Sequence, residues 1–350
     1  MRNTDINIKD YDLIVIGAGS GGVRAARIAA NYGAKVAIVE SVRVGGTCVL
    51  RGCVPKKLLV YGSHIAHDLE DASGFGWNIG SIEHDWVKLI EAKNNELDRL
   101  NSIYLNLLSK VEIITGFGKI IGNNEVEVNG SIIRANKILI AVGGKSFLPE
   151  IKGIDLCINS DQALDLKALP KKIVINGGGY IALEFASIFA SFGSDVTLIY
   201  RGKHILRGFD ADISNLITEE YIKNNIKILT ETEIISVSKT NHDLLVTLSN
   251  NEEIISNEVM FATGRVPNTN GLGLNEIGIK NGSIGEVIVD KNNQTSINNI
   301  YAIGDVTNRI NLTPVAIAEG QVFSDNIFGG ISKVCDYENV ASAVFSQPAI

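Results

Sequence analysis

The hydrophobic pattern begins with two short β-branched runs separated by a segment of helical period. A strand is predicted at residues 12–16, a helix at residues 21–32, and a second strand over KVAIVE, which ends at Glu40. This order is typical of a βαβ unit. The same order of elements returns further along the chain, over residues 172–177, 180–192 and 195–200. The duplication predicts an α/β protein with two Rossmann-like three-layer domains.

Further segments complete the predicted pattern. A polar amphipathic helix is expected at about residues 85–108, and Asn129 and Gly130 favour a hairpin turn in the β-rich stretch that follows. A similar hairpin is predicted over residues 245–265. The strand NIYAIGD and a helix at residues 314–328 predict that the chain returns to the first domain, so that the second domain is inserted in the first.

Composition narrows the classes of function. The 350 residues are many for one domain, and 32 basic against 39 acidic side chains give a formal charge of −7. Since no Lys/Arg-rich run occurs, nucleic acid and membrane surfaces are not expected as partners. The polar N-terminus and the short apolar run after it fit neither a signal peptide nor a membrane span, which predicts a cytoplasmic protein. Four cysteines are too few for a secreted disulfide framework, and Cys157 and Cys335 are interpreted as small core residues.

The first βαβ unit contains a dinucleotide-binding motif in its full context. In GAGSGG, Gly17, Gly19 and Gly22 follow a strand and open a helix, and Glu40 closes the next strand. Glycines let the backbone approach a pyrophosphate at the positive end of the helix, and a carboxylate accepts hydrogen bonds from ribose hydroxyls. The alternative is a tight turn without a ligand, which the carboxylate at the expected place disfavours.

The second βαβ unit repeats the motif, but the residue after its second strand is basic instead of acidic. Gly177, Gly179 and Ala182 stand in GGGYIA, and Arg201 follows the second strand, with Arg207 in the same loop. A carboxylate there would repel a 2′-phosphate, whereas two guanidiniums can hold it through charge-assisted hydrogen bonds. Each arginine alone has the ordinary interpretation of a surface residue, but their place beside the motif predicts NADPH rather than NADH.

The segment GGTCVLRGCVPKK holds Cys48 and Cys53. Five residues of regular helix advance about 7.5 Å, beyond the roughly 7 Å limit for bridged Cα atoms. A disulfide between the two therefore needs an irregular turn, which Gly52 can supply, while Pro55 suits the first turn of a helix. Cys53 is thus expected at a helix N-terminus, where the helix end and Lys56 stabilise a thiolate. The alternative is that both are small apolar core residues.

Six ordered motifs give the chain a family resemblance. It resembles the class I flavoprotein disulfide reductases, or pyridine nucleotide-disulfide oxidoreductases, in GGTCVLRGCVPKK, GAGSGG with Glu40, GGGYIALE, ATGRVPNT, YAIGDV and LTPVAIAEG, over essentially the whole chain. It is most similar to the branch that reduces glutathione disulfide. The resemblance implies that electrons pass from NADPH through FAD to the Cys48–Cys53 pair. Cys53 would face the flavin, and Cys48 would attack the substrate.

The resemblance also implies the residues of the FAD site. Asp305 would bind the ribityl chain of the flavin. Thr313 would be the N-cap of a helix whose first residue is Pro314, and this helix would direct its N-terminus at the flavin. The expected FAD-binding residues are Gly17, Gly19, Ser20, Gly22, Glu40, Thr47, Lys56, Asp305 and Thr313.

Further roles come from the same resemblance. Lys56 and Glu184 resemble a catalytic ion pair beside the flavin, and Tyr180 resembles an aromatic gate that yields to the nicotinamide. The expected NADPH-binding residues are Gly177, Gly179, Tyr180, Ile181, Glu184, Arg201, Arg207 and Gly264. The expected catalytic residues are Cys48, Cys53, Lys56 and Glu184. No metal is expected.

The implied substrate is glutathione disulfide, with a role in glutathione metabolism and cell redox homeostasis. The positions that resemble its binding site are Ser20, Arg24, Arg27 and Tyr104, whereas Leu107 and Gln321 depart from the family pattern. The alternatives are a related reductase of the dihydrolipoamide dehydrogenase or mercuric reductase type, or a non-catalytic flavin-binding remnant. Dihydrolipoamide dehydrogenases carry an acid where this chain has Arg201 and Arg207, so these arginines disfavour the dihydrolipoamide dehydrogenase type.

The predicted domains follow the two sites. An FAD-binding domain is expected over residues 1–147 and 269–333, an NADPH-binding domain over 148–268, and the start of an interface domain over 334–350. Members of the family continue into that domain, which forms the homodimer and supplies a His–Glu acid–base pair. A truncated chain is therefore expected to be impaired in the last step, thiol exchange with glutathione disulfide.

Overall fold

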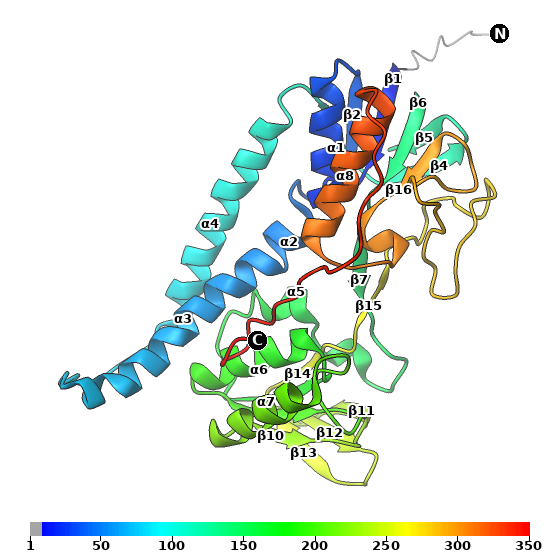
Figure 1. Ribbon diagram of the computed structural model, residues 1–350. Coiled ribbons are helices and arrows are strands. Elements are labelled where there is room, and N and C mark those ends of the chain that lie inside the picture. The colour runs from blue at the N-terminus through cyan, green and yellow to red at the C-terminus, as the bar shows by residue number, and fades with distance from the viewer. Residues whose placement is uncertain (1–8) are drawn as a thin grey trace. The chain divides into compact units, whose positions relative to one another are not determined.

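The computed structural model describes residues 9–350 (Figure 1). Residues 1–8 lie outside the described residues. Two predictions include them, the lack of a signal peptide and the first part of the FAD-binding domain. The chain forms two compact units. Unit 1 contains the chain up to Leu50 with residues 97–145 and 266–340, and unit 2 contains residues 51–96, 146–265 and 341–350. The functional domains remain a prediction.

Unit 1 is built on a mixed sheet with a parallel centre. Its strands are β1 (Lys9–Ile16), β2 (Val36–Glu40), β3 (Glu112–Thr115), β4 (Gly118–Gly122), β5 (Glu125–Val128), β6 (Ser131–Ile140) and β16 (Ile300–Ala302). They are ordered β3-β2-β1-β6-β5-β4, and β16 also pairs with β6. Strands β3, β2, β1, β6 and β16 are parallel, whereas β4 and β5 add to β6 as an antiparallel meander. Parallel strands need crossover connections, which the helices of the unit provide.

The turn between β5 and β6 forms at the predicted Asn-Gly pair. Val128 pairs with Ser131, and the two residues between them, Asn129 and Gly130, have φ angles of 52° and 78°. Positive φ at both central residues is the requirement of a type I′ hairpin turn, which Asn and Gly meet at little cost. The predicted hairpin is therefore confirmed.

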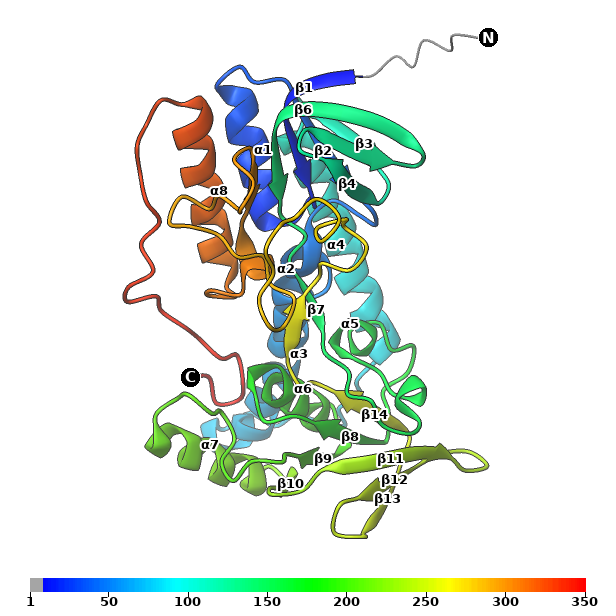
Figure 2. The ribbon, with the colours of Figure 1, turned by 90° about the vertical axis from the view of Figure 1, so that its right-hand side faces the viewer.

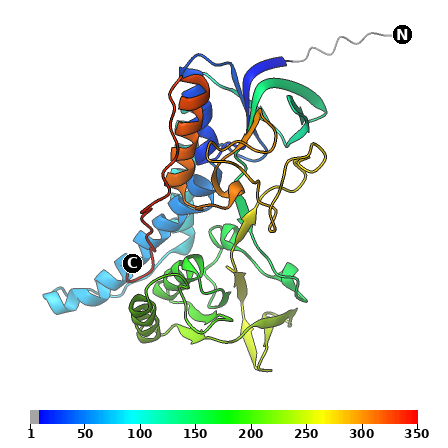
Figure 3. The same ribbon diagram turned by 45° about the vertical axis from the view of Figure 1, so that its right-hand side comes forward.

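Two helices cover one face of the unit 1 sheet. Helix α1 (Ser20–Asn31) and helix α8 (Thr313–Phe328) lie side by side (Figures 1 and 3). A Cβ on Gly320 would lie 2.5 Å from the carbonyl oxygen of Gly21, so only glycine allows the two backbones to come this close. The Ser324 hydroxyl also donates a 2.8 Å hydrogen bond to the Ala25 carbonyl. This packing holds the end of α1 that follows the first dinucleotide motif.

Unit 2 contains a parallel sheet and an antiparallel one. The parallel sheet has the order β10-β9-β8-β14, and the antiparallel sheet has the order β11-β12-β13 (Figure 2). The bounds are β8 (Lys172–Asn176), β9 (Asp195–Ile199), β10 (Lys227–Leu229), β14 (Glu258–Phe261), β11 (Ile234–Lys239), β12 (Leu244–Leu248) and β13 (Glu253–Ser256). The β12–β13 pair forms the hairpin predicted within residues 245–265.

Helix α6 (Tyr180–Ser191) forms the centre of the unit 2 core. It is apolar on almost every side and buries Leu183, Phe185 and Phe189 against β8 and β9. The remaining helical segments of the chain are α2 (Gly46–Leu50), α3 (Cys53–Asp71), α4 (Trp86–Leu107), α5 (Ser160–Ala163), α7 (Ala211–Lys223), and the 3₁₀ turns η1 (Ala72–Phe75), η2 (Ile154–Leu156) and η3 (Gly304–Thr307). Short strands β7 (Gly144–Ser146) and β15 (Arg265–Pro267) lie where the chain passes from one unit to the other.

The predicted elements of both βαβ units are confirmed within one residue, apart from an earlier start of β1. The fold is α/β, with two Rossmann-like domains, the second inserted in the first. Within residues 9–350, no helix combines the length and the apolar character that crossing a membrane requires.

Candidate active site

The first dinucleotide loop joins β1 to α1. Gly17 has a φ of 103°, and a Cβ there would lie 2.4 Å from the Ala141 carbonyl oxygen. A Cβ on Gly22 would lie 2.0 Å from the carbonyl oxygen of Gly17, so no side chain fits at either position. At Gly19 the nearest atom lies 3.8 Å from a built Cβ, which leaves this side of the loop open. The loop thus has the tight turn and the accessible backbone that a pyrophosphate requires.

Glu40 lies at the carboxyl end of β2, beside this loop. Its Oε2 accepts a 2.8 Å hydrogen bond from the Ala18 amide, and its Oε1 accepts a 2.9 Å bond from the Val42 amide. A carboxylate has about four lone-pair positions, so acceptor capacity remains for two ribose hydroxyls. The loop and the carboxylate fit the adenosine half of FAD.

The second dinucleotide loop joins β8 to α6 in unit 2. Gly177 has a φ of 151°, and a Cβ there would lie 2.4 Å from the Ala262 carbonyl oxygen. A Cβ on Gly178 would lie 2.5 Å from the Tyr200 ring, whereas a Cβ on Gly179 would meet nothing within 4 Å. The loop therefore packs tightly on the protein side and is open at Gly179. Gly179 directly precedes α6, whose N-terminus favours a phosphate.

Arg201 and Arg207 are both exposed in the segment after β9. The residue before Arg207 holds this segment against the dinucleotide loop, because the Leu206 amide donates a 2.7 Å hydrogen bond to the Gly178 carbonyl. Leu206 is 2% exposed and has a φ of 53°, an unusual value for a leucine. Sequence reasoning missed this contact, since an apolar residue in a basic loop gives no signal for it. The two guanidiniums fit the 2′-phosphate of NADPH.

The two cysteines lie on consecutive helices. Cys48 is half-buried on α2, and Cys53 is the exposed first residue of α3. Between them Gly52 has φ −152° and ψ −112°, outside the regular regions, and its carbonyl accepts a 3.0 Å hydrogen bond from the Lys56 amide in the first turn of α3. The predicted irregular turn and helix start are confirmed. At this position the helix end stabilises a thiolate on Cys53.

Lys56 and Glu184 form a buried ion pair in unit 2. The Lys56 Nζ lies 2.6 Å from Glu184 Oε1, and the side chains are 11% and 3% exposed. The charges come from α3 and α6, and each would be costly to bury without the other. The Phe345 amide donates a further 2.9 Å hydrogen bond to the same oxygen. Sequence reasoning paired the two charged residues but missed Phe345.

Basic residues on α1 lie near Cys48 in unit 1. Burial raises the pKa of the Tyr104 hydroxyl, the nearby Cys48 raises it further, and Arg24 and Arg27 act in the opposite direction. Cys48, Arg24 and Arg27 therefore all act electrostatically on the Tyr104 hydroxyl. The Nε atom of Arg27 is buried without a hydrogen-bond partner among the described residues, so a donor remains for an anionic ligand.

The two departures from the family pattern differ in their contacts. Gln321, on α8, accepts a 3.4 Å hydrogen bond from Arg24 and donates a 2.8 Å bond to Asp325. It therefore restrains a residue of the predicted substrate site. Leu107, at the end of α4, is 37% exposed.

Asp305 lies in η3, and Glu319 on α8 holds this turn. Glu319 is 1% exposed, and its Oε2 accepts a 2.6 Å hydrogen bond from the Gly304 amide. Its Oε1 accepts bonds of 2.8 Å from Arg309 and 2.7 Å from the Tyr337 hydroxyl. Burial and the bond to this carboxylate raise the pKa of Tyr337, so the phenol stays a donor. Sequence reasoning missed Glu319, because its hydrogen-bond partners are distant from it in the chain and no local pattern indicates them.

The N-cap prediction for α8 is wrong by one residue. The helix begins at Thr313, and Leu312 is the N-cap, with an extended backbone of φ −127° and ψ 138°. Pro314 still lies in the first turn, where its missing amide leaves no bond unmade. The threonine hydroxyl therefore stands on the helix rather than before it.

The remaining predicted residues lie near these loops. Thr47 is half-buried on α2, Ser20 and Ile181 are half-buried in the first turns of α1 and α6, and Tyr180 is 44% exposed. Gly264 follows β14, and its carbonyl accepts a 2.9 Å hydrogen bond from the Phe147 amide.

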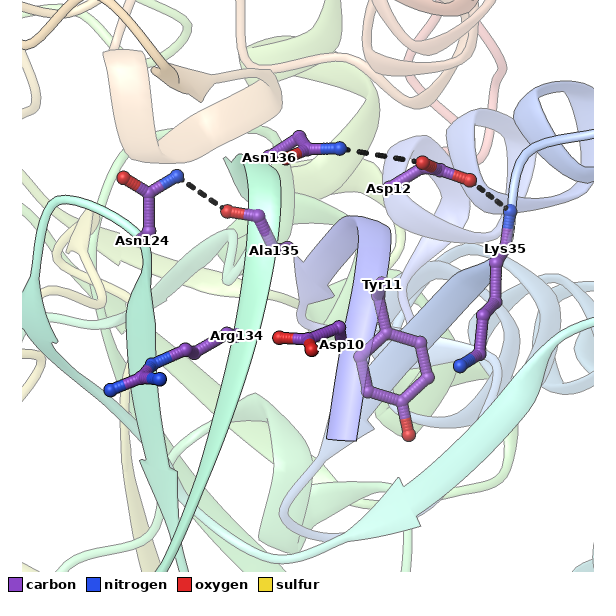
Figure 4. Close-up of a pocket in the computed structure, with 8 residues that line it drawn as sticks. All are labelled: Asp10, Tyr11, Asp12, Lys35, Asn124, Arg134, Ala135 and Asn136. Atoms are coloured by element: carbon purple, nitrogen blue, oxygen red, sulfur yellow. Dashed lines mark hydrogen bonds between the residues drawn. The ribbon is translucent and has the colours of Figure 1, made fainter. Parts of the chain in front are cut away.

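A polar cavity of about 330 Å³ lies elsewhere on unit 1 (Figure 4). It opens at the start of β1, opposite the strand ends that carry the dinucleotide motif. Its lining residues are Asp10, Tyr11, Asp12, Lys35, Asn124, Arg134, Ala135 and Asn136. Since ligands of parallel sheets bind beyond the carboxyl ends of the strands, this cavity is not the dinucleotide site.

Two dinucleotide loops and a cysteine pair at a helix start define a nicotinamide-dependent flavoprotein that acts on disulfides. Residues 11–320 match the model of the pyridine nucleotide-disulphide oxidoreductase family, and the chain belongs to this family. It is an oxidoreductase, and its cofactors are FAD and NADPH.

Curated relatives share the name glutathione reductase. The chain is 48% identical to that of Burkholderia cepacia over 341 residues, which cover 97% of this chain and 76% of the relative. It is 46% identical to that of a Nostoc species, with 97% and 77% covered. It is also 48% identical to the chloroplastic/mitochondrial enzyme of Pisum sativum, of which 64% is covered.

Proposed function

We propose that this protein is an NADPH-dependent glutathione-disulfide reductase. The observation that carries the proposal is Cys53 at the start of α3, after a short helix that bears Cys48, in a chain with two dinucleotide loops. FAD, when bound, supplies two-electron transfer from NADPH to the cysteine pair. The curated relatives named glutathione reductase support this choice of reaction.

The chemistry of the cysteine pair balances in two exchanges. The Cys48 thiolate attacks one sulfur of glutathione disulfide, forms a mixed disulfide, and releases one glutathione thiolate. The Cys53 thiolate then attacks the Cys48 sulfur, restores the Cys48–Cys53 disulfide, and releases the second glutathione. Two electrons leave the pair, and two protons are taken up by the products. The helix start at Cys53 favours the second step, because it stabilises the thiolate that attacks.

The residues near Cys48 support an anionic substrate. Arg24 and Arg27 lie on α1 and Tyr104 on α4, and the buried Nε of Arg27 has a hydrogen-bond donor to offer. A glutathione peptide carries two carboxylates, which guanidinium groups bind with charge-assisted hydrogen bonds. We assign Ser20, Arg27 and Tyr104 to this substrate site.

An anaerobic titration with NADPH tests the proposal. We expect one equivalent to produce a long-wavelength absorption band, because the Cys53 thiolate would then lie against oxidised flavin. The variant Cys53→Ser should lose this band, whereas Cys48→Ser should keep it, because only Cys53 is assigned to the flavin. Absence of the band in the unmodified protein would contradict the proposal and favour a non-catalytic flavin-binding protein.

Steady-state assays then identify the substrates. Glutathione disulfide should be reduced faster than oxidised lipoamide, and NADPH should be used in preference to NADH. Equal use of NADH would favour a protein of the dihydrolipoamide dehydrogenase type. Turnover of lipoamide or mercuric ion at the higher rate would overturn the assigned substrate.

We further propose that the chain forms a homodimer. Exposed apolar side chains occur along α3 and in the segment after it. In that segment Phe75 is 83% exposed and Trp77 is 71% exposed. Exposed apolar surface of this kind is typical of an interface. Light scattering after gel filtration should give twice the monomer mass, and Trp77→Lys should shift the mass toward the monomer. The control is Ile288→Lys, at an exposed apolar residue of unit 1. A monomeric wild type at micromolar concentration would overturn this.

We also propose a cytoplasmic location without nucleic-acid or membrane partners. The formal charge of −7 and the absence of a membrane-spanning helix within residues 9–350 support it. Cell fractionation tests the proposal, and recovery of the protein in the membrane pellet would contradict it.

A further inference from the structure

Residues 341–350 form a closed loop in unit 2. The Val344 amide donates a 2.8 Å hydrogen bond to the Ile350 carbonyl, and the Ile350 amide returns a 3.0 Å bond to Val344. Val344 is 1% exposed and belongs to the same hydrophobic cluster as the core of α6. The loop is therefore held by its backbone and by a buried side chain.

The loop is also attached to α3. The Gln347 amide group donates hydrogen bonds to the Val60 carbonyl and to the hydroxyl of Ser63, which is itself fully buried. Both partners lie on α3 beyond Lys56. The loop thus has a definite register on the helix that carries Lys56 and Lys57.

Phe345 contacts both members of the buried ion pair. Its amide lies 2.9 Å from Glu184 Oε1, the oxygen that also accepts from Lys56 Nζ at 2.6 Å. Its ring centre lies 4.4 Å from the Lys56 Nζ and 4.1 Å from the Lys57 Nζ. The amide stabilises the carboxylate, and the π face stabilises the ammonium groups.

These contacts matter because the pair is nearly dehydrated. A buried carboxylate and ammonium lose their water, and their mutual attraction offsets this only when further hydrogen bonds are made in good geometry. The Phe345 amide supplies one such bond, and its ring faces the cation on a side where water would otherwise compete.

We propose that Phe345 is a positioning residue that holds Lys56 and Glu184 in place for electron transfer from NADPH. The inference rests on the proposed function, in which this pair lies beside the flavin. The main-chain amide acts on Glu184, and the aromatic ring acts on Lys56 and Lys57. Val344 and Gln347 anchor the loop that presents both groups.

Chemical labelling of the lysines in the flavin-free protein tests the contact itself. Acetylation of Lys56, followed by peptide mass spectrometry, should be several-fold faster in Phe345→Leu than in wild type, while Phe345→Tyr should match wild type. Lys93 is the internal reference, because its side chain is 1% exposed and binds Leu164 and Asp165 elsewhere in the unit. An unchanged Lys56 rate in Phe345→Leu overturns the inference.

A second variant separates the contact from general loosening of the loop. Val344→Ala weakens the anchor but leaves the Phe345 ring and amide in the sequence. Because Val344 anchors the loop that presents the ring, Lys56 labelling should also rise in Val344→Ala, by less than in Phe345→Leu. If Lys93 labelling rises as much as Lys56 labelling in Phe345→Leu, the substitution has loosened the whole unit rather than exposed the pair, and the inference fails.

The reductive half-reaction provides the functional test. In the FAD-loaded protein, Phe345→Leu should slow reduction by NADPH by about 2-fold to 30-fold, the range that a cation–π contact supports, and Phe345→Tyr should restore the rate. An unchanged rate in Phe345→Leu overturns the inference while leaving the proposed function intact. Failure of the wild type to be reduced by NADPH would instead overturn the proposed function.

Discussion

The two dinucleotide loops of this protein have a similar backbone conformation, but the residues that follow their second strands carry opposite charges. In both, a glycine of positive φ after a β-strand approaches a carbonyl of a neighbouring segment, with a built Cβ 2.4 Å from the Ala141 oxygen at Gly17 and 2.4 Å from the Ala262 oxygen at Gly177. The residue after the second strand differs. The first unit places Glu40 at the end of its strand, and the second places Arg201 just past it. The glycines leave room beside both loops, and we propose that the charge of the residue after the second strand distinguishes a ribose with free hydroxyls from one that carries a 2′-phosphate.

The two loops also differ in the contacts that hold Glu40 and the two arginines in place. Glu40 is fixed by two backbone amides, that of Ala18 in the loop and that of Val42, two positions after Glu40. Arg201 and Arg207 are exposed, and the segment that bears them is attached through the Leu206 amide to Gly178. A carboxylate that accepts from hydroxyls needs a fixed direction. Guanidiniums that meet a dianion tolerate motion, because charge attraction acts over a longer range.

Removing the turn geometry of the first loop should have the largest effect. In Gly22→Ala the added carbon would lie 2.0 Å from the Gly17 carbonyl oxygen, a clash with backbone that cannot move away. We expect FAD content after purification to fall below about one tenth of wild type. Absorbance of released flavin per protein measures this.

Gly74→Ala is the matched control, because a Cβ at that position would meet nothing within 4 Å. Its FAD content should equal that of wild type. Full flavin content in Gly22→Ala would show that the loop does not bind the pyrophosphate.

Removing the positive charge of the second loop should have the next largest effect. The double variant Arg201→Ala/Arg207→Ala loses two charge-assisted contacts, each commonly worth about 1.5–3 kcal/mol, so the KM for NADPH should rise by about 10²-fold or more. The KM for NADH should change little, because NADH has no 2′-phosphate. Steady-state kinetics with both nucleotides check the ratio.

Lys203→Ala removes one positive charge from the same loop without touching either predicted contact, and it should leave the NADPH preference within about 3-fold of wild type, as a surface charge does. A preference for NADPH that survives the double variant would place the 2′-phosphate elsewhere.

Replacing the carboxylate of the first loop should have the smallest effect of the three. Glu40→Gln keeps the shape of the side chain but loses a charge and replaces one acceptor oxygen with an NH2 donor, which then faces a backbone amide donor. We expect FAD to dissociate about tenfold more easily, since the turn and the helix end remain. Equilibrium titration of the flavin-free protein measures the affinity, and an unchanged dissociation constant would remove Glu40 from the ribose site.

Much of the fold could be predicted because its signals are local. The helix at residues 180–192 ends at Ser191 in the structure, and the turn at Asn129 and Gly130 has the positive φ angles that these residues favour. Cys53 at a helix start followed from Gly52 and Pro55, residues that lie within two positions of it. Propensity, periodicity and turn chemistry act over a few residues, so the order of amino acids reveals them directly.

Several contacts of the candidate site could not be predicted. Phe345 and Glu184 are separated by 161 positions, and Lys56 and Glu184 by 128. Family resemblance paired the two charged residues, but no local pattern indicates that a phenylalanine amide would reach the same carboxylate. Glu319, which holds the turn of Asp305, is an ordinary helix residue until the fold brings Gly304 to it.

By itself, the sequence determined the two βαβ units, the glycines and charges of their loops, and the irregular turn between Cys48 and Cys53, because these depend on backbone preferences within short segments. Only the tertiary structure decided which side chains support them. Three hydrogen bonds join groups that packing alone brings together. They link Leu206 to Gly178, Gly304 to Glu319, and Phe345 to Glu184. A buried amide or carboxylate finds its partner wherever the folded core places one, and the cost of leaving it unpaired makes that partner necessary.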